Sequence, residues 1–297
     1  MKPYNTMRID CIAERFIRAG TEEEIREAIQ FARENDLPFL VIGNGSNLIF
    51  PSFYGGLIIL IDLKDFHVEE KEEGIELIAG AGIPLPKAAR EITERKGEGM
   101  EWAGGVPGTM GGAVRGNAGA FGDLISDHLL EVEALDMNEL KKRTFTKEEC
   151  AFDYRDSFFK RNGGYIILSV RMLFPRKKNE DSKFEEFLKH RKENHPQDPS
   201  AGSVFKNPEV DDEFYNEYTD MERFRELGFI PARVLVEECG LKGKKRGGAM
   251  ISYKHPNFIV NKGGATGKNV KELISLVKER VREKFGIEME EEVVIVE

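Results

Sequence analysis

One stretch of sequence restricts the possible folds more than any other, residues 102–122, which read WAGGVPGTMGGAVRGNAGAFG. Eight of these twenty-one residues are glycine, and most of the others are small. Glycine accepts positive φ angles and lets backbone N–H groups approach a ligand without an intervening Cβ. We therefore expect the main chain here to wrap closely around an anionic or flat cofactor. The alternative is a flexible linker, but linkers of this density are rich in serine, and this stretch carries Trp102, Met110 and Phe121.

The rest of the chain has the periodicities of a mixed α+β protein. Thr21 and Glu24 have the spacing of a capping box, which predicts a helix from 22 to 35. Further helices are predicted by apolar residues at helical spacing, at 84–97, 184–188 and 270–281. A helix at 231–238 is predicted by Pro231 at its start and Gly240 after its end. Strands are predicted by short apolar or alternating runs, at 37–42, 57–63, 67–69, 75–78, 132–136, 165–174, 257–261 and 287–296.

A second glycine turn, GNGSN at 43–47, directly follows the predicted strand 37–42. A classical dinucleotide fingerprint, GxGxxG, would need glycine where Leu48 stands and a helix where Pro51 interrupts the chain. A Rossmann site is therefore disfavoured. The turn is still suited to hold a pyrophosphate through exposed N–H groups. The alternative is a plain turn from a strand into a loop.

Composition argues against several classes of partner. The net charge of −9 argues against nucleic acid, because binding to a phosphate backbone needs a basic surface. No apolar run reaches the roughly 20 residues of a membrane span, and the first residues lack the apolar core of a signal peptide. We expect a cytoplasmic protein with no membrane partner and no obligate protein partner. The three cysteines are far apart and the histidines do not cluster, so no metal site is expected.

Six motifs occur in an order that resembles a known family. They are GNGSN at 43–47, the glycine-rich stretch, YRDS at 154–157, AGSVFKNP at 201–208, SYKHPNFIVN at 252–261 and EEEVVIV at 290–296. With them the chain resembles the UDP-N-acetylenolpyruvoylglucosamine reductases, or MurB, over nearly its whole length. It is similar to the shorter subclass, which lacks a tyrosine loop over the substrate. One departure is Glu291, where many members have proline.

The resemblance implies an α+β fold in three parts. Two subdomains of the vanillyl-alcohol-oxidase type, 1–64 and 65–183, would hold FAD, with the terminal strand 286–297 returning to the second. Residues 184–285 would bind substrate, and the charged stretch 176–183 would mark the boundary before them. The activity implied is reduction of UDP-N-acetylenolpyruvoylglucosamine to UDP-N-acetylmuramate, with NADPH as the hydride donor and FAD as the relay. This is a cytoplasmic step of peptidoglycan synthesis, and both nucleotides would use one cleft in turn.

The resemblance also assigns roles to residues. Arg155 would bind the substrate carboxylate, Ser203 would donate a proton to carbon, and Glu292 would polarise the carboxylate or a bound water. FAD would be bound by Gly43, Asn44, Gly45, Ser46, Asn47, Gly105, Val106, Pro107, Gly108, Thr109, Gly112, Asn117, Gly119, Ala120 and Gly122. Substrate contacts would come from Tyr154, Asn207, Lys242, His255 and Asn257.

Other interpretations of these residues are open. Without the resemblance, Arg155 would be assigned to a surface pair with Asp153 or Asp156, and Ser203 would be an ordinary loop serine. The basic run that contains Lys242 is suited to a substrate diphosphate, but such runs are more often solvated loops. An FAD-dependent sugar or alcohol oxidase of the same fold is the rival enzyme, although neither glycine motif contains a histidine for covalent flavin attachment. A nucleotide-binding regulator without catalysis is the rival from another class.

Overall fold

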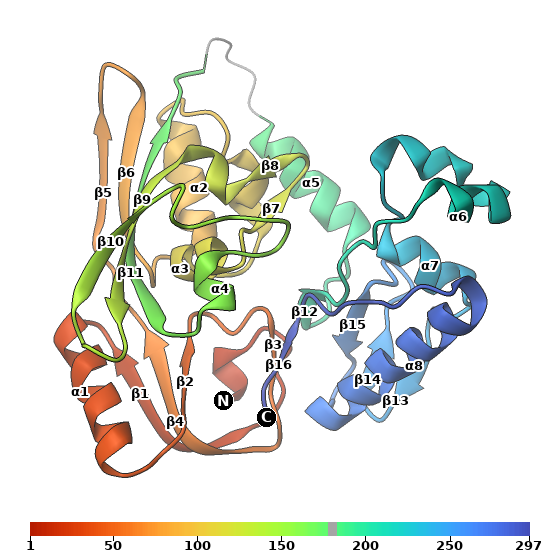
Figure 1. Ribbon diagram of the computed structural model, residues 1–297, viewed down its shortest axis with the longest axis horizontal. Helices are drawn as coiled ribbons and strands as arrows, with labels where there is room; N and C mark the ends of the chain where they lie inside the picture. Colours follow the sequence, from red (N-terminus) through yellow and green to blue (C-terminus); the bar gives the residue numbers. More distant parts are fainter. Residues whose placement is uncertain (178–182) are drawn as a thin grey trace. The chain divides into compact units, whose positions relative to one another are not determined.

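The computed structural model describes residues 1–177 and 183–297, and their contacts divide the chain into two compact units (Figure 1). Unit 1 comprises Met1–Ile12, Ser46–Tyr54 and Asn194–Glu297, and unit 2 comprises Ala13–Gly45 and Gly55–Glu193. Within the described ranges, no helix is both long and apolar enough to cross a membrane.

The first sheet of unit 2 has three strands in the order β1 (Ile12–Ala19), β4 (Phe53–Ile61), β2 (Phe39–Ile42). β2 and β4 run parallel. Helix α1 (Glu22–Glu34) connects β1 to β2 and begins with the predicted capping box of Thr21 and Glu24. Its buried face is made by the apolar residues Ile25, Ala28, Ile29 and Ala32. The chain therefore starts with the predicted β-α-β arrangement, which ends at the turn 43–47.

The second sheet of unit 2 is antiparallel, with five strands in the order β10 (Lys142–Thr146), β9 (Leu129–Asp136), β11 (Tyr165–Phe174), β6 (Ile75–Gly80), β5 (Phe66–Glu70). Helices α2 (Leu85–Glu94) and α3 (Met110–Arg115) both contact this sheet (Figure 1). The remaining helices of this region are α4 (Phe158–Arg161) and α5 (Phe184–Asn194). One buried cluster of apolar side chains, which includes Trp102 and Phe145, joins the helices to the strands.

The glycine-rich stretch is more ordered than a loop. It forms the 3-10 helix η2 (Glu101–Gly105), then α3, then a small hairpin of β7 (Gly119–Ala120) and β8 (Asp123–Leu124), followed by η3 (Ile125–His128). The Thr109 hydroxyl caps α3 by accepting a hydrogen bond from the N–H of Gly112, at 3.4 Å. If the main chain here encloses a ligand, as predicted, both the short helix α3 and the turns around it would do so.

Unit 1 is built on an antiparallel sheet in the order β12 (Ser200–Ser203), β15 (Phe258–Asn261), β14 (Ala249–Ile251), β13 (Lys245–Arg246). Helix α8 (Gly267–Phe285) contacts β13 and β14, and the predicted apolar stripe from Val270 to Val281 is its buried face. The other helices are η1 (Lys2–Tyr4), α6 (Asp212–Glu217), η4 (Thr219–Leu227) and α7 (Ala232–Glu238). Strand β16 (Val294–Ile295) pairs in parallel with β3 (Leu48–Ile49).

The pairing of β16 corrects one prediction. The terminal strand was expected to return to residues 65–183, but its partner is Leu48–Ile49, within the first predicted subdomain. The physical reason is a set of main-chain bonds: the N–H of Val294 donates to Asn47 O at 2.9 Å and the N–H of Val296 donates to Ile49 O at 3.0 Å. The division into three domains stays a prediction. Of its boundary stretch 176–183, residues 178–182 lie outside the described part of the chain.

Candidate active site

The two glycine motifs, far apart in sequence, meet in unit 2. A Cβ added to Gly43 at the end of β2 would lie 2.5 Å from the Thr109 hydroxyl oxygen, which is too close for any other residue without movement. The turn after β2 therefore contacts the N-terminus of α3 directly, and glycine is required for that approach. This contact supports the prediction that both motifs serve one ligand.

Asn117 contributes an unused acceptor to this region. Its side chain is buried, and its amide nitrogen donates to the Asp153 carbonyl at 2.9 Å. Its amide oxygen has no hydrogen-bond partner within the described ranges. A buried polar atom without a partner costs free energy, so a ligand that donates a hydrogen bond here would be favoured.

Arg191 on α5 is a candidate ligand contact that the sequence motifs did not identify. A Cβ on Gly105 would lie 2.7 Å from Arg191 Cδ, so this side chain packs against the glycine-rich stretch. Burial lowers the pKa of Arg191, and no carboxylate of the described chain forms an ion pair with it. Among the described residues its Nε is buried without a hydrogen-bond partner, its Nη2 donates to the Trp102 carbonyl at 3.5 Å, and its guanidinium lies over the ring of Phe121.

Arg191 is partly buried, and a partly buried cation without a counter-ion costs free energy, so this side chain favours an anionic ligand beside the glycines. A glycine-lined approach and a guanidinium without a carboxylate partner in the described chain fit a cofactor that carries phosphates, and the unused amide oxygen of Asn117 fits a hydrogen-bond donor elsewhere on such a cofactor. A sequence signal was available, because Phe184, Phe187, Leu188 and Arg191 have helical spacing, which places the arginine on the apolar face of α5.

Arg155 lies at the tip of a tight turn in unit 2. Asp153 and Asp156 exchange two main-chain hydrogen bonds of 3.1 Å, which leaves Tyr154 and Arg155 as the two turn residues. Arg155 has a φ of 54°, an uncommon conformation for a side chain of this size. Its Nη2 donates to the Gly119 carbonyl at 2.9 Å, and its guanidinium lies over the ring of Tyr154. Asp156 forms its ion pair with Arg161, at 2.6 Å.

The turn of Arg155 is attached to the glycine-rich stretch at two further points. The Asn117 amide donates to Asp153 O, and the buried hydroxyl of Ser157 donates to Arg115 O at 2.7 Å. The YRDS motif and the glycine motif are therefore one structural element of unit 2. A guanidinium held in this way is a suitable site for a carboxylate.

Ser203 lies at the end of β12 in unit 1, and a β-bulge orients it. Ser200 pairs with Val260 and Ser203 with Phe258, so β12 has one residue more than its partner between these pairs. Gly202, with a φ of 82°, provides the left-handed conformation that the bulge needs. Bulges redirect the side chain that follows them, and they are common beside active sites. Ser203 thus has the setting of a functional residue.

Glu292 lies on the segment that pairs with the residues after Ser203. Its N–H donates to Val204 O at 2.7 Å, and its carbonyl accepts a 2.9 Å bond from the side-chain amide of Asn47. The structure therefore brings three predicted site residues, Ser203, Glu292 and Asn47, into adjacent segments of unit 1.

Two other predicted substrate contacts hold the main chain of this region. Asn257 is buried and exchanges two hydrogen bonds, of 3.0 and 2.9 Å, with the main chain of Phe205. The Asn207 side-chain oxygen accepts a 3.0 Å bond from the N–H of Ala232 at the start of α7. Both asparagines thus have a structural role in shaping the segment from Ser203 to Asn207. Their contact with substrate stays a prediction.

Lys242 and His255 differ in how well they fit a ligand site. Lys242 forms an ion pair with Glu237, so part of its charge is neutralised. His255 is largely enclosed beside the rings of His195 and Phe258, and among the described residues its Nδ1 has no hydrogen-bond partner. Burial, and then the nearby charge of Arg233, lower the pKa of His255 to about 4. The imidazole is therefore neutral at pH 7 and is suited to a hydrogen bond rather than to charge pairing.

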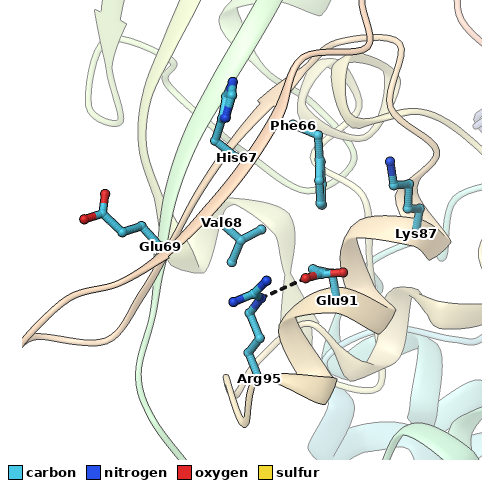
Figure 2. Close-up of a pocket in the computed structure, with 7 residues that line it drawn as sticks. All are labelled: Phe66, His67, Val68, Glu69, Lys87, Glu91 and Arg95. Carbon is cyan, nitrogen blue, oxygen red and sulfur yellow. Dashed lines mark hydrogen bonds and ion pairs between the residues drawn. The ribbon is translucent and has the colours of Figure 1, made fainter.

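A surface pocket in unit 2 has a different location from all these residues. It lies between β5 and α2, has a volume of about 640 Å³, and is lined by Phe66, His67, Val68, Glu69, Lys87, Glu91 and Arg95 (Figure 2). The Arg95 and Glu91 side chains, one turn apart at the C-terminal end of α2, form a 2.8 Å ion pair on one wall of it. None of the predicted site residues lines this pocket, so it is not part of the candidate active site.

Comparison with known proteins identifies both halves of the chain. Residues 13–140 match the model of an FAD binding domain, and residues 194–296 match the model of the UDP-N-acetylenolpyruvoylglucosamine reductase C-terminal domain. The reductase of Alkaliphilus oremlandii is 36% identical over 100% of this chain and 91% of its own length. That of Carboxydothermus hydrogenoformans is 38% identical over 96% of this chain and 88% of its own length.

A crystal structure gives the same result. The UDP-N-acetylenolpyruvylglucosamine reductase (MurB) of Thermus caldophilus superposes with a TM-score of 0.77 and 30% identity, covering 100% of this chain and 97% of its own. The predicted α+β fold with an FAD-binding region is thus confirmed. The chain belongs to the UDP-N-acetylenolpyruvoylglucosamine reductase (MurB) family and is a flavin-dependent oxidoreductase.

Proposed function

We propose that this protein reduces UDP-N-acetylenolpyruvoylglucosamine to UDP-N-acetylmuramate, with NADPH as the hydride donor, in the cytoplasmic pathway to peptidoglycan. The observation that carries this proposal is the pairing, within unit 1, of the segment that bears Ser203 with the segment that bears Glu292. Family membership supports it. An oxidase of the same fold often attaches its flavin covalently through a histidine, and neither glycine motif of this chain contains one.

FAD would be held by residues 43–47 and by the glycine-rich stretch from Gly105 to Gly122. The contact between Gly43 and Thr109 supports this assignment, because it removes side-chain bulk from the place where a diphosphate would lie. Arg191 would neutralise a phosphate, and Asn117 would accept a hydrogen bond from the cofactor. When bound, the flavin supplies hydride transfer from NADPH to the substrate double bond.

Arg155 would stabilise the charge that develops on the substrate. Hydride added to the terminal carbon of the enolpyruvyl group moves electron density to the neighbouring carbon and its carboxylate. A planar guanidinium binds a carboxylate through two parallel hydrogen bonds, which strengthen as the negative charge grows. The turn that holds Arg155 supports this role, since its 2.9 Å bond to Gly119 O restricts the side chain.

Ser203 would then protonate the carbon that has gained electron density. A hydroxyl is a weak acid, but an enolate-like carbon is basic enough to take its proton when the hydroxyl is correctly placed. Hydride and proton together add two hydrogen atoms across the double bond. Glu292, on the paired segment, would orient the carboxylate or a water. Tyr154, Asn207, Lys242, His255 and Asn257 remain proposed substrate contacts.

A steady-state assay tests this function. NADPH consumption should depend on the enolpyruvyl nucleotide, and the product should be heavier than the substrate by two hydrogen atoms. UDP-N-acetylglucosamine, which lacks the enolpyruvyl group, is the matched control and should support no turnover. Oxygen-dependent oxidation of a sugar, with no NADPH consumption, would instead favour the oxidase.

A further inference from the structure

We propose that the ion pair between Lys278 and Glu291 is a positioning device, which fixes the register of the terminal segment and so places Glu292 for reaction. Lys278 lies on α8, and its Nζ is 3.0 and 2.9 Å from the two carboxylate oxygens of Glu291. The two side chains are 35% and 26% exposed, so the pair is partly shielded from water. This inference rests on the proposed role of Glu292.

Within the described residues, the main-chain hydrogen bonds around Glu291 lie on either side of this residue and do not include its own N–H. The N–H of Lys206 donates to Glu290 O at 2.9 Å, and the N–H of Glu292 donates to Val204 O at 2.7 Å. These bonds flank the antiparallel bridge between Phe205 and Glu291. In such a pair, the facing residues make no ladder hydrogen bond of their own. The N–H of Glu291 is therefore not used in the ladder.

An unused N–H at this position is compatible with proline, which has none. A proline at this position would restrict the backbone by its ring. Glutamate imposes no such restriction, so this chain needs another way to fix the segment. The ion pair to α8 supplies one, because the buried stripe that includes Val277 and Val281 holds this helix against the core of unit 1.

The three consecutive glutamates at 290–292 specify the register of this segment less sharply than a single glutamate would. A slip by one residue would still place glutamate at two of these three positions, and the buried Met289 and Val293 on either side oppose such a slip.

Glu292 follows Glu291 directly, at a bend in the chain, and its N–H donates to Val204 O. A bond that holds Glu291 toward α8 therefore also restrains the main chain from which the Glu292 side chain projects. The Lys206–Glu290 pair, at 2.5 Å, is less suited to this task because Glu290 is 69% exposed.

The test is the substitution Lys278→Met, with each half of the reaction followed separately by flavin absorbance. Reduction by NADPH should be unchanged, whereas reoxidation by the enolpyruvyl nucleotide should slow about ten- to a hundredfold, since a small misplacement of a reacting group has effects of this size. Arg280→Met is the matched control. Arg280 lies on the same helix and pairs with Glu283 of that helix at 2.9 Å, so both half-reactions should keep their rates.

A rescue variant separates positioning from general stability. Adding Glu291→Pro to Lys278→Met should restore reoxidation to within about threefold of wild type, because the ring restores the restriction without using the N–H. A double-mutant cycle of Lys278→Met and Glu291→Gln on the free energy of unfolding gives a readout independent of activity and should show coupling. Equal slowing of both half-reactions, no slowing, or no rescue by proline would each overturn the proposal.

Glu292→Gln distinguishes this inference from the function on which it rests. If Glu292→Gln slows reoxidation but Lys278→Met does not, the positioning proposal fails and the role of Glu292 stands. If Glu292→Gln leaves reoxidation unchanged, the proposed role of Glu292 fails and the positioning proposal fails with it.

Discussion

Substitution of Ser203 by alanine isolates one step of the proposed reaction. The change removes a single oxygen from a half-buried side chain. The pairing of β12 with β15 and the bulge at Gly202 depend on the main chain, so the position of residue 203 should be retained. We expect a stability change below about 1 kcal/mol, in the range of ordinary substitutions outside the core.

The expected kinetic effect is large and confined to one half-reaction. Loss of a general acid costs about a hundredfold to ten-thousandfold, which corresponds to about 2.7 to 5.4 kcal/mol in activation free energy. That loss should appear in flavin reoxidation by the enolpyruvyl nucleotide. Flavin reduction by NADPH needs no proton from this hydroxyl, so its rate should remain within about tenfold of wild type, or about 1.4 kcal/mol.

Stopped-flow absorbance of the flavin measures the two rates in separate experiments. Ser200→Ala is the control, since it makes the same change on the same strand at a residue that pairs with Val260, before the bulge. Both of its rates should match wild type. If Ser203→Ala slows the two half-reactions equally, or slows neither, Ser203 is a structural residue and the proton donor has been assigned wrongly.

Four further predictions concern the flavin site, the substrate site, the cleft and stability. Gly43→Ala places a Cβ 2.5 Å from the Thr109 hydroxyl, so the affinity of the apoprotein for FAD should fall at least about tenfold. Gly163→Ala is the control, because its Cβ meets nothing within 4 Å, and it should leave the FAD affinity unchanged. Arg155→Ala should weaken binding of the enolpyruvyl nucleotide as well as slow reoxidation; slowing with unchanged affinity would contradict a ground-state carboxylate contact. Initial-rate plots for NADPH and the nucleotide should be parallel, and intersecting plots would argue against a shared cleft. Burial raises the pKa of Glu101, but hydrogen bonds from Lys177 and from main-chain N–H groups outweigh burial, so the pKa lies below its ordinary value of 4.5. The ionised Glu101 therefore stabilises the folded state above about pH 4.5, and this contribution is lost as the pH falls through the lowered pKa. Glu101→Gln should therefore reduce the free energy of unfolding by about 3 kcal/mol at pH 7, with a smaller difference in acid, and a difference independent of pH would refute the linkage.

The sequence predicted elements whose signals are local. The capping box of Thr21 and Glu24 sets the start of α1, and the apolar stripe of α8 is its buried face, because both depend on residues within a few turns. The terminal strand was predicted as an element, but its partner was not. Pairing between residues 294–295 and 48–49 is set by hydrogen bonds across almost the whole chain, and no sequence pattern encodes that choice.

The site residues, too, divide into those with a local sequence signal and those whose role depends on contacts between distant parts of the chain. The glycine motifs could be recognised from the sequence because a high density of glycine usually means that the main chain must approach something closely. The close contact of Gly43 with Thr109 agrees with that interpretation. Asn257 was predicted as a ligand contact, yet its amide is hydrogen-bonded to Phe205, a role that needs the fold to be seen. Arg191 was missed because an arginine in a charged run is normally solvated, although its helical spacing with the apolar residues of α5 was a signal. Tertiary packing is needed to show that, among the described residues, its Nε is buried without a hydrogen-bond partner.

The proposed reaction requires that the flavin of this protein passes its electrons to an enolpyruvyl double bond. The most direct measurement is a single turnover without oxygen, in which the protein is first reduced with one equivalent of NADPH and then mixed with UDP-N-acetylenolpyruvoylglucosamine. We expect the absorbance of oxidised flavin to return, with one equivalent of UDP-N-acetylmuramate formed per flavin. If the flavin stays reduced with this nucleotide, or is reoxidised equally well by UDP-N-acetylglucosamine, the enolpyruvyl double bond is not its electron acceptor.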